Sequence, residues 1–114
     1  MPTTDAEILA RHQPSCRQRA RMELAIVHGI IAAASATGYT LEDAEEGPTD
    51  DLLGLLFDLD ESHLLVKKGG QEVGWILLVF GNSGWDCVSD YTVNLEEFLR
   101  PVHELADRLE NGLA

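Results

Sequence analysis

The chain has 114 residues, and its composition, 45% hydrophobic and 25% charged, is that of a globular protein with one core rather than of a disordered tail. Its 20 acidic residues outnumber the 8 basic residues and give a formal net charge of -12. A field of this sign repels phosphate, so direct binding to nucleic acid or to an anionic membrane is disfavoured.

A short helix is predicted at the beginning of the chain. Thr4 and Glu7 have the spacing of a capping box, in which each residue hydrogen-bonds to the backbone of the other. Apolar residues follow directly, and Pro14 then ends the helix.

A second helix is predicted directly after that proline, from Cys16 to about Thr37. Ser15 and Gln18 repeat the capping-box spacing, and Gly38 suits the left-handed residue that ends many helices. The first turns carry three arginines, which have the wrong sign for the helix dipole at that end: Arg17, Arg19 and Arg21. We therefore expect them to face acidic groups, which the second part of the chain supplies.

The acidic residues are concentrated in that second part. Residues 1–40 hold three acids and four basic residues, whereas residues 41–114 hold 17 acids and four basic residues. The densest block holds nine acids and no basic residue: Glu42, Asp43, Glu45, Glu46, Asp50, Asp51, Asp58, Asp60 and Glu61. Within it, Thr49 or Asp50 can cap a short helix that ends near Phe57, and residues 42–48 are expected to form a loop.

Three runs predict an antiparallel meander: Ser62–Lys68, Glu72–Phe80 and Trp85–Tyr91. Glycine pairs supply the turns, at residues 69–70 and within residues 81–84. The middle run is apolar on both of its faces, and such a strand needs cover above and below.

The last predicted element is a helix that begins at a third capping-box pattern, Asn94 with Glu97, and ends at Gly112. Pro101 lies inside it, so the helix either kinks there or restarts with the proline in its first turn. The predicted fold class is α+β: N-terminal helices, a three-stranded antiparallel meander and a C-terminal helix packed on the sheet, in one domain of residues 1–114.

Neither cysteine predicts a disulfide framework or a zinc knuckle, because Cys16 and Cys87 are far apart and form no CxxC pair. Both are expected to be reduced and partly buried. The N-terminus lacks the pattern of a signal peptide, and the most apolar run, Leu24 to Ala36, is too short to span a bilayer. The expected location is the cytoplasm.

The sequence contains no common catalytic or cofactor-binding motif. The four histidines lie in different predicted elements without metal-ligand spacing: His12, His28, His63 and His103. We therefore expect no cofactor, no metal and no enzymatic activity. The alternative is catalysis by Cys87 with a histidine, or by Asp86 and Asp90 as an acid pair.

The segment from Gly84 to Glu96, GWDCVSDYTVNLE, resembles one in small uncharacterised proteins of bacteriophages and prophages. The likeness covers mainly residues 55–110, a hairpin followed by a helix. It implies a mobile-element origin but no particular activity. The segment also has a purely structural explanation, in which Asn94 caps the helix and Trp85 and Tyr91 pack on its first turn.

Two functions remain open. In the first, the nine carboxylates of the acidic block bind a basic protein partner and inhibit or shield it, as DNA-mimicking anti-defence proteins of phages do. In the second, the protein is a homodimeric chaperone-like or structural module that pairs through its sheet face, and its size and charge are similar to those of type III secretion chaperones. The first function requires that the carboxylates stay exposed as one patch and do more than keep the protein in solution.

Overall fold

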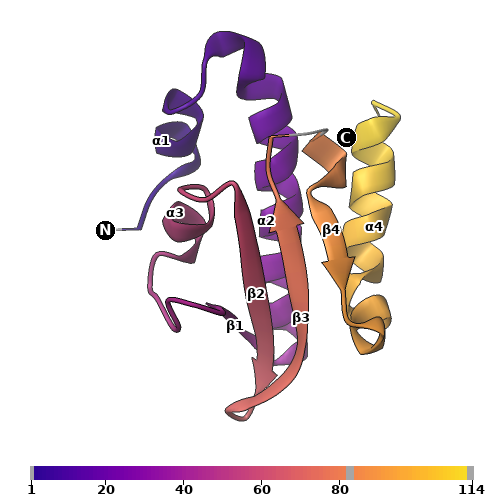
Figure 1. Ribbon diagram of the computed structural model, residues 1–114. Helices are drawn as coiled ribbons and strands as arrows, with labels where there is room; N and C mark the ends of the chain where they lie inside the picture. The colour runs from indigo at the N-terminus through magenta and orange to yellow at the C-terminus, as the bar shows by residue number, and fades with distance from the viewer. Residues whose placement is uncertain (1, 82–83, 113–114) are drawn as a thin grey trace.

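The computed structural model describes residues 2–81 and 84–112, which form helices on one side of an antiparallel sheet (Figure 1). Among these residues the elements follow in chain order: α1 (Asp5–Ala10), a 3₁₀ turn η1 (Pro14–Cys16), α2 (Arg17–Thr37), β1 (Thr40–Asp43), α3 (Leu52–Leu56), β2 (Glu61–Lys68), β3 (Gln71–Val79), a 3₁₀ turn η2 (Gly84–Asp86), β4 (Val88–Tyr91), a 3₁₀ turn η3 (Val93–Leu95) and α4 (Glu96–Glu110). None of the helices in these two ranges is long and apolar enough to cross a membrane.

The first capping box is confirmed and the second is wrong. Thr4 Oγ1 accepts the N–H of Glu7 at 3.2 Å, and the Glu7 carboxylate accepts the N–H of Thr4 at 3.3 Å. Cys16 is the residue that precedes α2, and its side chain makes no capping hydrogen bond, because a 3₁₀ turn and not a loop leads into the helix. Gly38 ends α2 as predicted, with a left-handed φ of 77°.

The sheet has four strands in the order β1-β2-β3-β4, all antiparallel, so the α+β class is confirmed and the count of three strands is wrong. The additional strand is β1, which runs from Thr40 opposite Lys67 to Asp43 opposite Leu64. It occupies part of the segment that was expected to be a loop, because its polar side chains find partners on β2 that are distant in the sequence.

The third predicted strand is shorter than expected. Its first residues form the turn η2, which packs on α2, and only Val88–Tyr91 joins the sheet. A Cβ atom added at Gly84 would lie 2.5 Å from the Cβ of Met22 and 2.9 Å from the carbonyl oxygen of Arg19. Glycine therefore allows η2 to pack directly against the helix, and the chain reaches the sheet only after Cys87.

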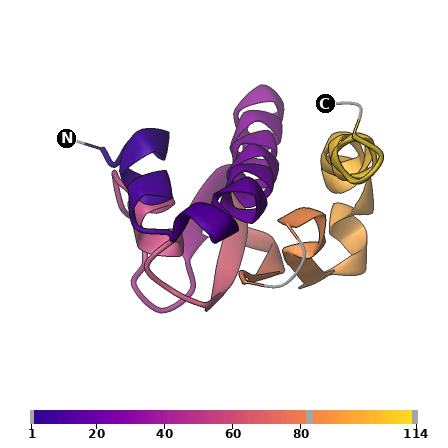
Figure 2. The ribbon, with the colours of Figure 1, turned by 90° about the horizontal axis from the view of Figure 1, so that it is seen from above.

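α2 covers one face of the sheet, and the alternate residues that point toward it are buried: Ser62, Leu64 and Val66 of β2, and Gly74, Ile76 and Leu78 of β3. The expectation that the middle strand is covered on both faces is wrong within the described residues. All helices lie on the same side of the sheet when the molecule is seen from above (Figure 2). We call the other side the open sheet face; it is formed by His63, Leu65, Trp75, Leu77 and Val79.

α4 packs mainly beside α2 rather than flat on the sheet, and buries Phe98, Leu99 and Val102 in the common core. The close approach of the two helices occurs at Gly29, where an added Cβ atom would lie 3.3 Å from Leu105 Cδ2. Pro101 lies inside the uninterrupted helix.

The third capping box is wrong. The side-chain amide of Asn94 donates to the carbonyl oxygen of Val73 at 2.7 Å, and Glu97 pairs with Arg100. No side chain caps α4. The residues that match the local pattern are thus used in a contact with β3 and in a surface ion pair.

Candidate functional site

One of the nine predicted site residues, Asp43, is buried. Its side chain accepts hydrogen bonds from the hydroxyl of Ser62 at 2.8 Å and from the backbone N–H groups of Glu45 at 3.0 Å and Glu46 at 2.9 Å. Burial alone would raise its pKa, yet these hydrogen bonds outweigh burial and the pKa is lowered from the ordinary 3.8. The expectation that all nine carboxylates are exposed is therefore wrong for Asp43.

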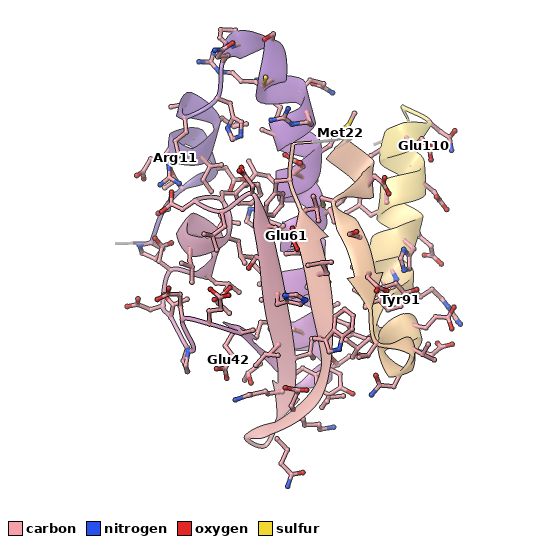
Figure 3. The ribbon with its side chains drawn as sticks, in the orientation of Figure 1. Arg11, Met22, Glu42, Glu61, Tyr91 and Glu110 are labelled. Carbon is pink, nitrogen blue, oxygen red and sulfur yellow. The ribbon has the colours of Figure 1, made fainter. Side chains whose placement is uncertain are left out.

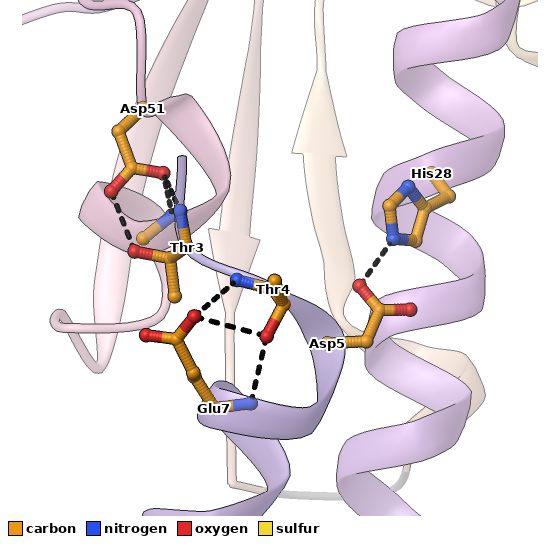
Figure 4. A network of polar contacts seen from close by, with 7 residues as sticks. Thr3, Thr4, Asp5, Glu7, His28 and Asp51 are labelled. Carbon is orange, nitrogen blue, oxygen red and sulfur yellow. Dashed lines mark hydrogen bonds and ion pairs between the residues drawn. The ribbon is translucent and has the colours of Figure 1, made fainter. Parts of the chain in front are cut away.

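Asp51 holds the N-terminal segment to α3 (Figure 4). It accepts the N–H of Thr3 at 2.9 Å and the hydroxyl of Thr3 at 2.6 Å, and it also caps α3 by accepting the N–H of Gly54 at 3.3 Å. The Thr3 hydroxyl is the main reason why the pKa of Asp51 is lowered, followed by the Thr3 N–H. The predicted cap, Thr49 or Asp50, is wrong by one or two residues, because Thr49 instead accepts the N–H of Asp51 at 3.1 Å.

Two more acids of the block form ion pairs with basic residues. Glu42 lies 2.8 Å from Lys67 across the β1–β2 pair, and both side chains are largely covered, with 16% and 27% exposure. Asp58 lies 2.8 Å from Arg11, but this pair is open to solvent and is worth little. These four acids are therefore engaged in contacts within the chain.

The arginines of α2 do not neutralise the acidic block. Arg19 lies beside Glu23 on its own helix, with 3.6 Å between Arg19 Nε and Glu23 Oε1, and its guanidinium also donates to the carbonyl oxygen of Gly81 at 3.5 Å. In the described ranges neither Arg17 nor Arg21 forms an ion pair with an acid. The expectation that these arginines face acids of the second part is wrong, and Arg11 makes that contact instead.

The remaining acids of the block are exposed, and within the described residues no basic side chain lies within ion-pair distance of them: Glu45, Glu46, Asp50, Asp60 and Glu61. Glu45 and Glu61 line one depression of about 350 Å³ together with Leu59 and His63. We call Glu45, Glu46, Asp60 and Glu61 the acidic rim, because Glu46 and Asp60 are their chain neighbours. Asp50 does not line the depression. Figure 3 labels Glu42, which lies on β1, and Glu61, which is the first residue of β2.

A buried charged cluster under the β3–η2 connection was not predicted. The side chain of Glu23 is fully buried and accepts the N–H of Gly81 at 2.9 Å. Burial raises its pKa from the ordinary 4.5, although Gly81, Arg19 and His12 act in the opposite direction. The only sequence signal was an acid at the beginning of the apolar face of α2.

Cys87 lies close to this cluster and is fully buried. Burial, Glu23 and Asp86 raise the pKa of its thiol to about 12, so the nucleophilic thiolate is scarce at neutral pH. This argues against catalysis by Cys87 with a histidine. Asp86 lies in η2 rather than on a strand with Asp90, so the two do not form the strand pair that the sequence suggested.

Across residues 2–81 and 84–112, no group of three or more histidine, cysteine, aspartate or glutamate side chains could hold a metal ion. Comparison with protein-family models, with curated proteins and with solved structures finds no match to this chain. The acidic rim is therefore interpreted from its own chemistry.

Proposed function

We propose that this protein is a non-enzymatic interaction protein whose acidic rim binds a lysine- and arginine-rich segment of a protein partner and so inhibits or shields that partner. One observation carries the proposal. Four of the nine acids of the block are engaged inside the chain. Among the residues that the structure describes, the acids of the rim are exposed and without a basic partner, and two of them, Glu45 and Glu61, line one depression.

The rim is held in place before any partner binds. Asp43 fixes the backbone of Glu45 and Glu46 through two hydrogen bonds, and its own position is fixed by Ser62 on β2. Asp60 is tied to the end of β3, because its carbonyl oxygen accepts the N–H of Phe80 at 2.9 Å. A partner therefore meets carboxylates on ordered backbone, which lowers the entropy that binding must overcome.

The chemistry of the depression suggests what kind of segment fits. Leu59, 38% exposed, and His63 line the same depression as Glu45 and Glu61. A basic segment with one apolar side chain among its lysines and arginines would contact both kinds of group. The net charge of -12 would attract such a partner from a distance, and this attraction falls as salt is added.

Imitation of nucleic acid is the more specific form of the same proposal. It requires a partner that normally binds duplex DNA in the cytoplasm, and it agrees with the mobile-element origin that the resemblance of residues 84–96 implies. A competition experiment separates the two forms of the proposal. A DNA mimic displaces duplex DNA from its partner, whereas a general shield of basic surfaces also binds basic proteins that do not bind DNA.

The test compares two variants with equal loss of charge. The rim variant is Glu45→Gln/Glu46→Gln/Asp60→Asn, and the control changes three exposed acids of α4, Glu104→Gln/Asp107→Asn/Glu110→Gln. Each protein is immobilised, incubated with a bacterial lysate and eluted with salt. The proposal predicts a basic protein that the wild type and the control retain and the rim variant does not. Equal retention by both variants, or retention of no basic protein, would contradict it.

A further inference from the structure

One ion pair of the acidic block differs from the other contacts of the block because a partner can reach it. Arg11 Nη1 lies 2.8 Å from Asp58 Oδ1, and the two side chains are 40% and 66% exposed. The other engaged acids are better covered, since Asp43 is buried, the side chain of Glu42 is 16% exposed and Asp51 is half-buried. Of these four acids, Asp58 alone is mostly exposed.

Asp58 lies beside the acidic rim. It precedes Asp60 by two residues, so their Cα atoms are at most about 7 Å apart. Leu59, which lies between them in the sequence, lines the same depression as Glu61. A basic segment that contacts the rim therefore comes within reach of Asp58, and there it meets Arg11.

The position of Arg11 is set by α1. Arg11 ends this helix, and its backbone N–H donates to the carbonyl oxygen of Ile8 at 3.1 Å. Ile8 is fully buried, and α1 packs on α2. Asp5 of α1 also lies 2.8 Å from His28 of α2 (Figure 4). Arg11 is therefore held beside Asp58 by the end of an anchored helix.

We propose that Arg11 is an autoinhibitory competitor for the basic side chains of the partner at Asp58. The inference rests on the proposed function, because it concerns how the partner of the acidic rim is bound. While the pair is formed, the charge of Asp58 is already balanced by Arg11. A basic segment on the rim supplies a lysine or arginine that takes the place of Arg11, and Asp58 then becomes an additional contact of that segment.

The strength of the pair suits such an exchange. An ion pair between exposed side chains contributes little to stability, so its loss leaves the fold intact. Arg11 nevertheless competes as part of the same chain, at an effective concentration on the order of millimolar. An isolated basic residue competes poorly against it, whereas a segment already held at the rim also acts at a high local concentration. The pair therefore favours partners with several neighbouring basic residues.

The test measures binding of the end-blocked, labelled peptide Arg-Arg-Leu-Arg-Arg by fluorescence anisotropy at low salt. Arg11→Gln is expected to bind this peptide about threefold more tightly than the wild type, which is the range of an exposed ion pair. Arg108→Gln is the matched control. It removes the same charge from an exposed position of α4 that forms no ion pair within the described residues, and its affinity is expected to stay within about twofold of the wild type.

A double-mutant cycle separates local competition from a general effect of charge. Asp58→Asn removes the carboxylate for which Arg11 and the peptide compete. In that background Arg11→Gln is expected to give no larger gain than Arg108→Gln gives. Arg11 and Asp58 are exposed and the substituted side chains are similar in size, so the variants are expected to fold. An Arg11→Gln protein that binds no more tightly than Arg108→Gln, or a gain that persists with Asp58→Asn, would overturn the proposal.

The rim variant Glu45→Gln/Glu46→Gln/Asp60→Asn distinguishes this inference from the proposed function. If it binds the peptide as tightly as the wild type while Arg11→Gln still binds about threefold more tightly, the rim is not the binding surface and the competition at Asp58 stands. If the rim variant loses binding and Arg11→Gln equals Arg108→Gln, the proposed function stands and the autoinhibitory contact is wrong. A peptide that none of these proteins binds would contradict both.

Discussion

Asp43 and Ser62 are joined by a hydrogen bond of 2.8 Å between two buried side chains on neighbouring strands. The same carboxylate holds the backbone of Glu45 and Glu46. A residue that belongs to the acidic block by sequence is thus a structural support for the exposed acids beside it.

Asp43→Ala is expected to lower the free energy of unfolding by about 1–3 kcal/mol, because the hydroxyl of Ser62 loses its acceptor in a buried site. Urea denaturation at neutral pH measures the effect. Glu45→Gln is the control, since the side chain of Glu45 is exposed. Equal stability of Asp43→Ala and the wild type would show that the hydrogen bonds do not support the loop.

The pH dependence of this contribution has a definite sign. The pKa of Asp43 is lowered on folding, so its ionised form stabilises the folded state at pH values above 3.8. The contribution is lost as the pH falls below 3.8 through the lowered pKa of the folded protein. Asp43→Asn should therefore lose its stability difference from the wild type in acid, as measured by urea titrations at a series of pH values. A difference that does not change with pH would contradict this account.

Glu23 should show the opposite dependence. Burial raises its pKa above 4.5, so its contribution to stability is fully present below that pH and is lost as the pH rises through the pKa of the folded protein. The free energy of unfolding of the wild type minus that of Glu23→Gln is expected to fall as the pH rises from 4.5 to neutrality. Glu104→Gln, on the exposed face of α4, is the control for the removal of a carboxylate. A constant difference for Glu23→Gln would mean that the carboxylate is well solvated.

Gly38 ends α2 with a left-handed φ of 77° and has no heavy atom close to the position of a Cβ. Gly38→Ala is therefore expected to cost about 1 kcal/mol through backbone strain alone. Gly38→Asn should cost less, because asparagine tolerates this conformation better. Thermal denaturation of both variants measures the order, and an alanine variant as stable as the wild type would contradict it.

Short sequence patterns correctly predicted those helix ends that depend on residues within one helical turn of each other. The capping box of Thr4 and Glu7 and the glycine end of α2 are of this kind, and both are confirmed. The capping-box pattern failed at Ser15 and at Asn94. No side chain caps α2, and the side chain of Asn94 instead donates a hydrogen bond to the carbonyl oxygen of Val73 on β3.

Long-range contacts explain most of what the sequence could not predict. β1 carries two acids and seemed to be a loop, since nothing local shows that Glu42 will pair with Lys67 or Asp43 with Ser62. For the same reason the sequence could not show which acids of the block remain exposed. The buried position of Glu23 depends on Gly81, which lies 58 residues away.

The most direct test of the acidic rim is calorimetric binding of the basic protein that the wild type retains from the lysate, at low and at high salt. The rim variant is expected to bind about tenfold more weakly than the wild type at low salt, and the α4 control within about twofold, with all affinities falling as salt is added. If both variants bind alike, or if salt does not change the affinity of the wild type, the rim is not the binding surface.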